Sequence, residues 1–311
     1  MTELILHHYP ASPYAEKTRL MLGFKGLSWR SVTIPPMMPK PDLTALTGGY
    51  RKTPVLQVGA DIYCDTALIA RRLEAEKAQP ALFPAELDAV VSAFGTWASQ
   101  VVFPRAVALV FQPESAAIRF ARFNDEQRQA FLADRAKLFS GGSAQRQNAE
   151  QVKHEWPALL ARLERQLSHA DGDFLFGAPT YADFALAHCM WFLKGTPVTA
   201  PMVDSYPHTS AWLGRVLGFG HGAPSELSSA EAIEIARAAA PAALPLDALD
   251  DASGLKPGDA VQVAATDYGV EAVVGELVFS GTEQIILKRE DERAGVVHVH
   301  FPRLGFSLQP A

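Results

Sequence analysis

The hydrophobic positions of residues 1–80 follow strand and helix periods in turn. ELILHH predicts a strand, and PYAEKTRLMLGF, residues 13–24, predicts a helix closed by Gly23 and Gly26. WRSVTI alternates with a period of two and predicts a second strand, whereas the four prolines of residues 34–42 exclude regular structure there. The pattern therefore begins as strand, helix, strand and irregular loop.

Two further strands and a helix complete this first part. PVLQV and DIYC flank Gly59-Ala60 and predict a hairpin. DTALIARRLEAEKA predicts a helix with Asp65 or Thr66 as its N-cap. Residues 1–80 are thus expected to form an α/β domain.

Strand patterns are absent from residues 84–222, where apolar residues recur at three-and-four spacing. The sequence TYAD, residues 180–183, is a capping box that opens the apolar helix FALAHCMWFL. We expect an all-helical domain over this range.

The pattern changes twice more towards the C-terminus. Residues 223–255 hold one short Ala-rich helix, ended by Pro241, and then a Pro-, Ala- and Asp-rich tether. Residues 256–311 hold short strands separated by Gly and Asp turns, which predict a small all-β barrel or sandwich. Since the tether is typical of linkers between separate units, we expect that residues 256–311 can be deleted without unfolding the rest.

Composition narrows the class of protein. The net charge of −6 gives no basic footprint for nucleic acid or anionic membranes, and residues 256–311 are themselves acidic. The N-terminus lacks a signal-peptide pattern, and no apolar run approaches the ~20 residues of a membrane span. Only Cys64 and Cys189 are present, so we expect a cytoplasmic protein without a disulfide framework.

The first predicted turn occupies the position of a thiol-redox motif but contains no cysteine. SPYA, residues 12–15, lies between strand and helix where thioredoxin-type proteins carry C-x-x-C. This makes thiol-disulfide exchange by the protein itself an unfavourable interpretation. Three separated stretches, YPASPYAEKTRLML, RKTPVL and CDTALIARRLE, resemble the N-terminal domain of the glutathione transferase superfamily, and FLFGAPTYADFAL resembles its helical-domain signature.

The resemblance implies a thioredoxin-like domain that binds glutathione, followed by a helical domain that supplies a second-substrate pocket. It implies a cytoplasmic, homodimeric detoxification enzyme that joins glutathione to a small electrophile, with no metal, nucleic acid or membrane partner. The alternative is a non-catalytic glutathione- or protein-binding module that retains the transferase fold. In either case the ligand brings the sulfur that the SPYA turn lacks.

Ser12 matches the catalytic hydroxyl of serine-type transferases and is also a natural helix N-cap. A helix N-terminus favours an anion by roughly 0.3–1 kcal/mol, and a hydrogen bond to a charged group adds roughly 1.5–3 kcal/mol. Together these effects can lower the pKa of a bound thiol, near ~8.5 when free, by about one to three units.

The resemblance assigns the glutathione contacts residue by residue. Thr53-Pro54 matches the family's cis-proline, which presents the backbone of Val55 to the cysteinyl part of glutathione. Asp65 and Thr66 match the pair that receives the γ-glutamyl end, where the carboxylate accepts from the ammonium. Lys52 is a candidate for the glycine carboxylate, and Lys40 is a poorer one.

Further candidates are less specific. The second-substrate pocket is expected to use Trp97, Phe103, Arg105 and Phe111, with Tyr9 also near it as a weaker rival to Ser12; all five residue types at such spacing also suit a core. Cys64 is expected to be buried filler. His298 and His300 share one strand face, but without a third ligand we expect them to face solvent rather than a metal.

Overall fold

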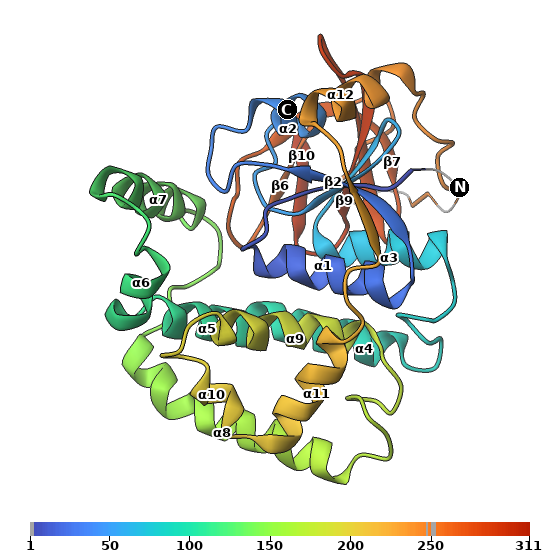
Figure 1. Ribbon diagram of the computed structural model, residues 1–311. Coiled ribbons are helices and arrows are strands. Elements are labelled where there is room, and N and C mark those ends of the chain that lie inside the picture. Colours follow the sequence, from blue (N-terminus) through green and yellow to red (C-terminus); the bar gives the residue numbers. More distant parts are fainter. Residues whose placement is uncertain (1–2, 247, 250–252) are drawn as a thin grey trace.

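The computed structural model describes residues 3–246, 248–249 and 253–311. Its strands join in one ten-stranded sheet with the order β10-β6-β7-β8-β9-β4-β3-β1-β2-β5. Helices α1 and α3 cover one face of this sheet, and α2 and α12 cover the other, as Figure 1 shows. In that view the helices of residues 84–222 lie mostly below the sheet, and helix α7 (Asp125–Leu138) lies to its left.

The N-terminal part has the thioredoxin-like order expected from the sequence. Its strands and helices are β1 (Ile5–His8), α1 (Pro13–Phe24), β2 (Ser28–Thr33), α2 (Pro41–Thr47), β3 (Val55–Val58), β4 (Asp61–Cys64) and α3 (Thr66–Glu76). Strands β1 and β2 are parallel, and β3 and β4 form the predicted hairpin. Helix α1 begins at Pro13 after the N-cap Ser12, because proline has no N–H to leave unsatisfied there.

Helix α2 corrects the expectation of an irregular loop over residues 34–42. The chain stays irregular as far as Lys40, and Pro41 then occupies the first helical position. The helix ends at Gly48, which has a left-handed φ of 75°. Its apolar residues Leu43 and Leu46 are buried against the sheet, so tertiary packing stabilises a helix of only seven residues.

The second region is helical, as predicted. It contains α4 (Asp88–Trp97), a π-helical turn η1 (Ala98–Val102), α5 (Phe103–Val110), α6 (Pro113–Arg119), α7 (Asp125–Leu138), α8 (Ala149–His169), α9 (Tyr181–Lys194), α10 (Pro201–Asp204) and α11 (Pro207–Leu217). Within the described ranges, no single helix has both the length and the hydropathy to cross a membrane, although the bent pair Asp88–Val110 and Pro113–Arg119 meets those two criteria together.

Helix α9 is the centre of this region, and the predicted capping box opens it. Asp183 accepts from the backbone N–H and hydroxyl of Thr180, from Leu175 N and from Trp212 Nε1. Most of the α9 residues are buried between α1 on one side and the other helices on the other. The box therefore fixes the helix on which the two regions pack.

The C-terminal strands extend the thioredoxin-like sheet instead of forming a separate barrel. Strand β9 pairs in parallel with the hairpin strand β4, and residues of both parts share one hydrophobic core. This differs from the expectation of a separately folding unit, because the edge of one part is completed by the other. The strands are β6 (Ala260–Ala265), β7 (Val273–Ser280), β8 (Gln284–Asp291), β9 (Gly295–Pro302) and β10 (Phe306–Pro310).

The intervening segment also joins the sheet. Strand β5 (Ala223–Glu226) pairs in parallel with β2 at the opposite edge, and α12 (Ser229–Ala238) then packs on α2 and β9. Helix α12 is the predicted Ala-rich helix, whereas β5 was not expected. Part of the predicted tether, residues 247 and 250–252, lies outside the described residues.

His298 and His300 face inward, which corrects the prediction that they face solvent. Both lie in register with β4, and His300 Nε2 is 2.9 Å from Asp61 Oδ1. The His300 ring also stacks on Tyr63, with 4.2 Å between ring centroids. Alternation placed the two histidines on one face correctly, but Asp61 and Tyr63 of the paired strand β4 share that face and contact His300 there.

Candidate functional site

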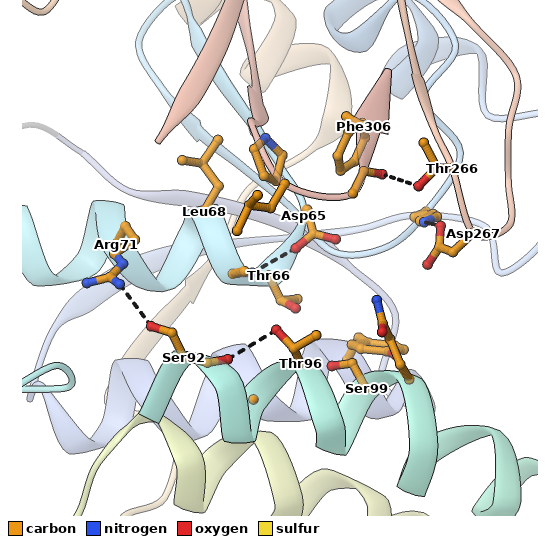
Figure 2. Close-up of a pocket in the computed structure, with 18 of the residues that line it drawn as sticks. Asp65, Thr66, Leu68, Arg71, Ser92, Thr96, Ser99, Thr266, Asp267 and Phe306 are labelled. Carbon is orange, nitrogen blue, oxygen red and sulfur yellow. Dashed lines mark hydrogen bonds and ion pairs between the residues drawn. The ribbon is translucent and has the colours of Figure 1, made fainter. Parts of the chain in front are cut away.

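A cavity of about 270 Å³ lies where the three parts of the chain meet. Its walls are the start of α3, the α4–η1 segment, and the loops that precede β7 and β10 (Figure 2). Five residues predicted for glutathione binding line it: Lys52, Thr53, Pro54, Asp65 and Thr66. Polar groups converge in a partly apolar cavity here, as is usual for ligand sites.

Asp65 holds an unusual backbone conformation at the cavity wall. Its φ is +75° and its ψ is 138°, and it has the one positive φ among the non-glycine residues that the structure describes. Its carboxylate accepts from Ala67 N at 2.8 Å, so Asp65, and not Thr66, is the N-cap of α3. Such a conformation costs on the order of 1–3 kcal/mol and is concentrated at ligand sites.

The Thr53-Pro54 peptide bond is cis, as the RKTPVL motif indicated. Val55 follows it as the first residue of β3; it is fully buried and, unlike Thr53 and Pro54, does not line the cavity. Lys40 donates to Thr53 Oγ1 at 3.0 Å and to the Arg51 carbonyl at 3.3 Å. Burial lowers the pKa of Lys40 to about 8. Lys40 thus stabilises this turn through hydrogen bonds and does not line the cavity.

Ser12 lies at the start of α1 but is 2% exposed and does not line the cavity. Its Oγ accepts from Ala15 N at 3.2 Å, which leaves the hydroxyl proton available for donation. Tyr14 is the residue of this turn that lines the cavity, and sequence reasoning did not select it. Burial raises the pKa of Tyr14 well above its usual value, so its phenol is a neutral donor.

A buried polar network fixes the turn before Ser12. The Arg19 guanidinium pairs with Glu16 at 2.6 Å, contacts His8 Nδ1 at 2.9 Å and donates to the Pro10 carbonyl at 2.9 Å. Burial lowers the pKa of His8 to about 4, and the nearby Arg19 charge acts in the same direction. The neutral imidazole therefore serves as an acceptor that positions this turn.

The five residues predicted for the second-substrate pocket do not line the cavity. Tyr9 packs on the sheet core, and Phe103 packs on Tyr14 and His188. The other three contact the helical region: Trp97 packs on Phe94 with the two rings tilted, Arg105 pairs with Glu155, and Phe111 lies against Phe120, Phe131 and Phe192.

The same helical segment presents a hydroxyl-bearing face to the cavity instead. Figure 2 shows Ser92, Thr96 and Ser99 along this face, opposite Asp65 and Thr66. Ser92 also accepts from Arg71 at 3.0 Å, which connects α4 to α3. The helical spacing of Ser92, Thr96 and Ser99 could have revealed this face from the sequence. The second-substrate pocket was instead predicted from the aromatic residues beside it.

The C-terminal region supplies a further wall, through residues that the sequence analysis did not select. Thr266, Asp267 and Tyr268 line the cavity from the loop before β7, and Phe306 does so from the start of β10. Asp267 Oδ1 is 2.6 Å from Lys52 Nζ, and the Tyr268 ring lies over the same ammonium, with its centroid 4.1 Å from Nζ. Their sequence, TDYG, reads only as a turn between strands.

The cysteines and histidines do not form a second chemical centre. Cys64 is buried in β4, where burial raises the pKa of its thiol well above the usual value. Among the described residues, no three His, Cys, Asp or Glu side chains lie close enough together to hold a metal ion.

Comparison with known proteins agrees with the arrangement of the elements. The family model for the glutathione S-transferase N-terminal domain matches residues 6–81, and that for the C-terminal domain matches residues 126–218. A solved structure of a GST-like protein from Pseudomonas syringae is 59% identical, covers 100% of both chains and has a TM-score of 0.85. The chain belongs to the glutathione S-transferase family.

More distant members of the glutathione S-transferase family share the fold. A transferase from Methylobacillus flagellatus with glutathione bound is 18% identical over 72% of this chain and 100% of its own, with a TM-score of 0.50. One from Rhodospirillum rubrum is 19% identical over 69% and 87%, with a TM-score of 0.51. No curated protein matches the sequence significantly. The Pseudomonas syringae protein, unlike these two, covers the C-terminal strands as well.

Proposed function

We propose that this protein binds glutathione in the cavity and activates its thiol for attack on a small electrophile. The observation that carries the proposal is the convergence of Lys52, Thr53, Pro54, Asp65 and Thr66 on one cavity. These residues come from two separate stretches of sequence, and the family resemblance implies a glutathione contact for all five.

Each part of the tripeptide would contact a different group around the cavity. Asp65 accepts from the γ-glutamyl ammonium, while Thr66 and the free amides of α3 donate to the adjacent carboxylate. The backbone of Val55 pairs with the cysteinyl part, and Lys52 takes the glycine carboxylate. These contacts direct the sulfur towards the start of α1.

Ser12 would then stabilise the thiolate by donating its hydroxyl proton, assisted by the N-terminus of α1. The thiol proton leaves to solvent. The sulfur lone pair forms a bond to the electrophilic carbon. The halide of an aryl halide departs with the electron pair of the bond that breaks, whereas in an epoxide or enone that pair moves to the oxygen or enolate, which takes a proton from solvent. Since the thiolate is the nucleophile, no general base on the protein is required.

A calorimetric titration of the full chain with glutathione tests binding, and conjugation assays with aryl halides, epoxides and enones test turnover. Saturable binding and a conjugate with at least one electrophile are expected. The absence of binding would contradict the proposal at its first step.

The burial of Ser12 favours a second candidate, a glutathione-binding module without turnover. In that case the cavity binds glutathione but the sulfur does not reach the Ser12 hydroxyl. Binding together with the absence of conjugation for the whole panel of electrophiles, and a bound-thiol pKa near its free value, would select this candidate.

We further propose that the protein is a cytoplasmic homodimer, in accordance with the family resemblance. Light scattering after size-exclusion chromatography measures the mass directly. A monomeric mass across the micromolar range would contradict the dimer.

A further inference from the structure

The ammonium of Lys52 is surrounded by residues of the C-terminal region. Asp267 Oδ1 lies 2.6 Å from Nζ, and the centroids of the Tyr268 and Phe306 rings lie 4.1 and 5.8 Å from it. The Lys52 side chain is only 11% exposed. Three residues from beyond position 260 thus enclose the cation that we assign to the glycine carboxylate of glutathione.

The neighbouring cation is neutralised as well. Arg51 pairs with Glu271 at 2.7 Å and with Asp134 of α7 at 2.8 Å. Both basic residues that precede the cis-proline turn are therefore paired with protein carboxylates. An anionic ligand meets no unpaired positive charge on Arg51 or Lys52.

The loop that carries Asp267 is held in place by specific contacts with the helical region. Ala144 N donates to the Asp267 carbonyl at 2.9 Å, and Gly269 N donates to the Leu138 carbonyl at 2.7 Å. A Cβ on Gly142 would lie 2.2 Å from the Asp267 carbonyl oxygen, so the two segments touch at a residue without a side chain. These contacts fix the loop at residues 138–144.

We propose that Asp267 is an internal competitor for Lys52: its carboxylate occupies the position of the ligand's terminal carboxylate, and an anionic tripeptide binds by displacing it. The inference rests on the proposed glutathione site and adds a specificity-determining residue from the C-terminal region. Tyr268, whose ring also lies over the Lys52 ammonium, moves with Asp267 when the loop is displaced.

The competition has a simple electrostatic basis. One carboxylate replaces another on the same ammonium, so binding gains little Coulomb energy at this position. At the same time the protein loses the contacts that hold the loop in place. An amide at position 267 keeps the oxygen that accepts from Tyr268 N at 2.7 Å but removes the charge. The amide holds Lys52 less firmly, because the ammonium then donates to a neutral oxygen and no longer forms an ion pair.

The test compares glutathione affinity in the full-length parent protein, Asp267→Asn and Glu276→Gln. Glu276 pairs with Lys288 in an exposed bridge on β7, so its variant makes the same change in net charge away from the cavity. Asp267→Asn is expected to bind glutathione at least threefold more tightly, and Glu276→Gln to match the parent. Combining Asp267→Asn with Lys52→Met is expected to abolish the gain, because the contested cation is absent.

Hydrogen exchange of the parent provides a measurement that needs no variant. Saturating glutathione should accelerate exchange over residues 266–271, since the ligand releases the loop. Slower exchange there, or equal or weaker binding by Asp267→Asn while the parent binds, would overturn the competition alone. The absence of glutathione binding by every one of these proteins would instead overturn the glutathione site and the competition with it.

Discussion

His7 Nε2 lies 2.8 Å from Gln57 Oε1 and joins the central strand β1 to its neighbour β3. The Gln57 amide nitrogen donates to the carbonyls of Gly59 and Ala232, so its oxygen faces His7 as an acceptor. His7 therefore carries its proton on Nε2 and is neutral. This pair also connects the hairpin to α12, which belongs to the C-terminal half of the chain.

The His7 pair predicts a loss of stability in acid. Burial lowers the pKa of His7 to about 4, from 6.5 in an unfolded chain. Below about pH 6.5 the unfolded chain binds a proton that the folded protein excludes, so the free energy of unfolding falls as the pH decreases towards 4. The full loss from this residue is about 3 kcal/mol. Urea unfolding from pH 7 to pH 4 measures it.

His7→Gln should make this pH dependence shallower, whereas His208→Gln, at an exposed histidine, should leave it unchanged. Equal slopes for the parent and His7→Gln would show that other groups cause the acid sensitivity.

Ser12→Ala should lower turnover by at least tenfold and move the pH–rate profile to higher pH, because the thiolate loses a charge-assisted hydrogen bond. It also removes an N-cap, which costs about 1 kcal/mol of stability. Ser228→Ala is a matched control, since Ser228 caps α12 in the same way and does not line the cavity. An unchanged pH–rate profile in Ser12→Ala would contradict this role of Ser12, and Tyr14 would be the next hydroxyl to test.

Asp65→Asn should raise the Michaelis constant for glutathione about tenfold or more, because the ammonium loses its charged acceptor. Asparagine keeps the capping oxygen and tolerates positive φ, so α3 should stay intact. Isothermal titration and the pH–rate profile together check this. If affinity is equal in both proteins, Asp65 is only a cap.

Asp183→Ala should destabilise the protein by about 3 kcal/mol or more, since it leaves Thr180, Leu175 and Trp212 with unpaired buried donors. Its carboxyl is buried, and burial raises its pKa. Thermal unfolding measures the loss. A change below 1 kcal/mol would mean that water replaces the carboxylate.

Deletion of residues 256–311 is expected to give an aggregating protein, in contrast to the expectation from sequence alone. Removing β9 exposes the edge of β4 and uncovers apolar residues such as Ile62 and Leu46. Size-exclusion chromatography and thermal unfolding of the shortened chain test this. A monodisperse protein with cooperative unfolding would restore the view of a separable unit.

Local patterns predicted the elements that are stabilised locally. The SPYA turn, the hairpin around Gly59 and the TYAD capping box carry their caps and turns in adjacent residues. Five cavity residues of the first region were also predicted, because the family resemblance covers contiguous motifs, whereas Tyr14 was not.

Contacts between distant segments were not encoded in such patterns. Strand β5 is an exposed APSE segment that is extended only because it pairs with β2. Asp267 reaches Lys52 across 215 positions, and no periodicity connects the two. The polar face of α4 was overlooked because aromatic residues there suit a core and a pocket equally.

The pairing of β4 with β9 imposes a waiting time during synthesis. His300 emerges 239 positions after its partner Asp61. At about 5–20 residues per second, the ribosome needs on the order of 10–50 s to supply it. During that interval the β4 edge of the nascent chain has no neighbouring strand, so it is open to pairing with another chain. The sheet formed by the first fifth of the chain is therefore completed only after the last fifth has been synthesised.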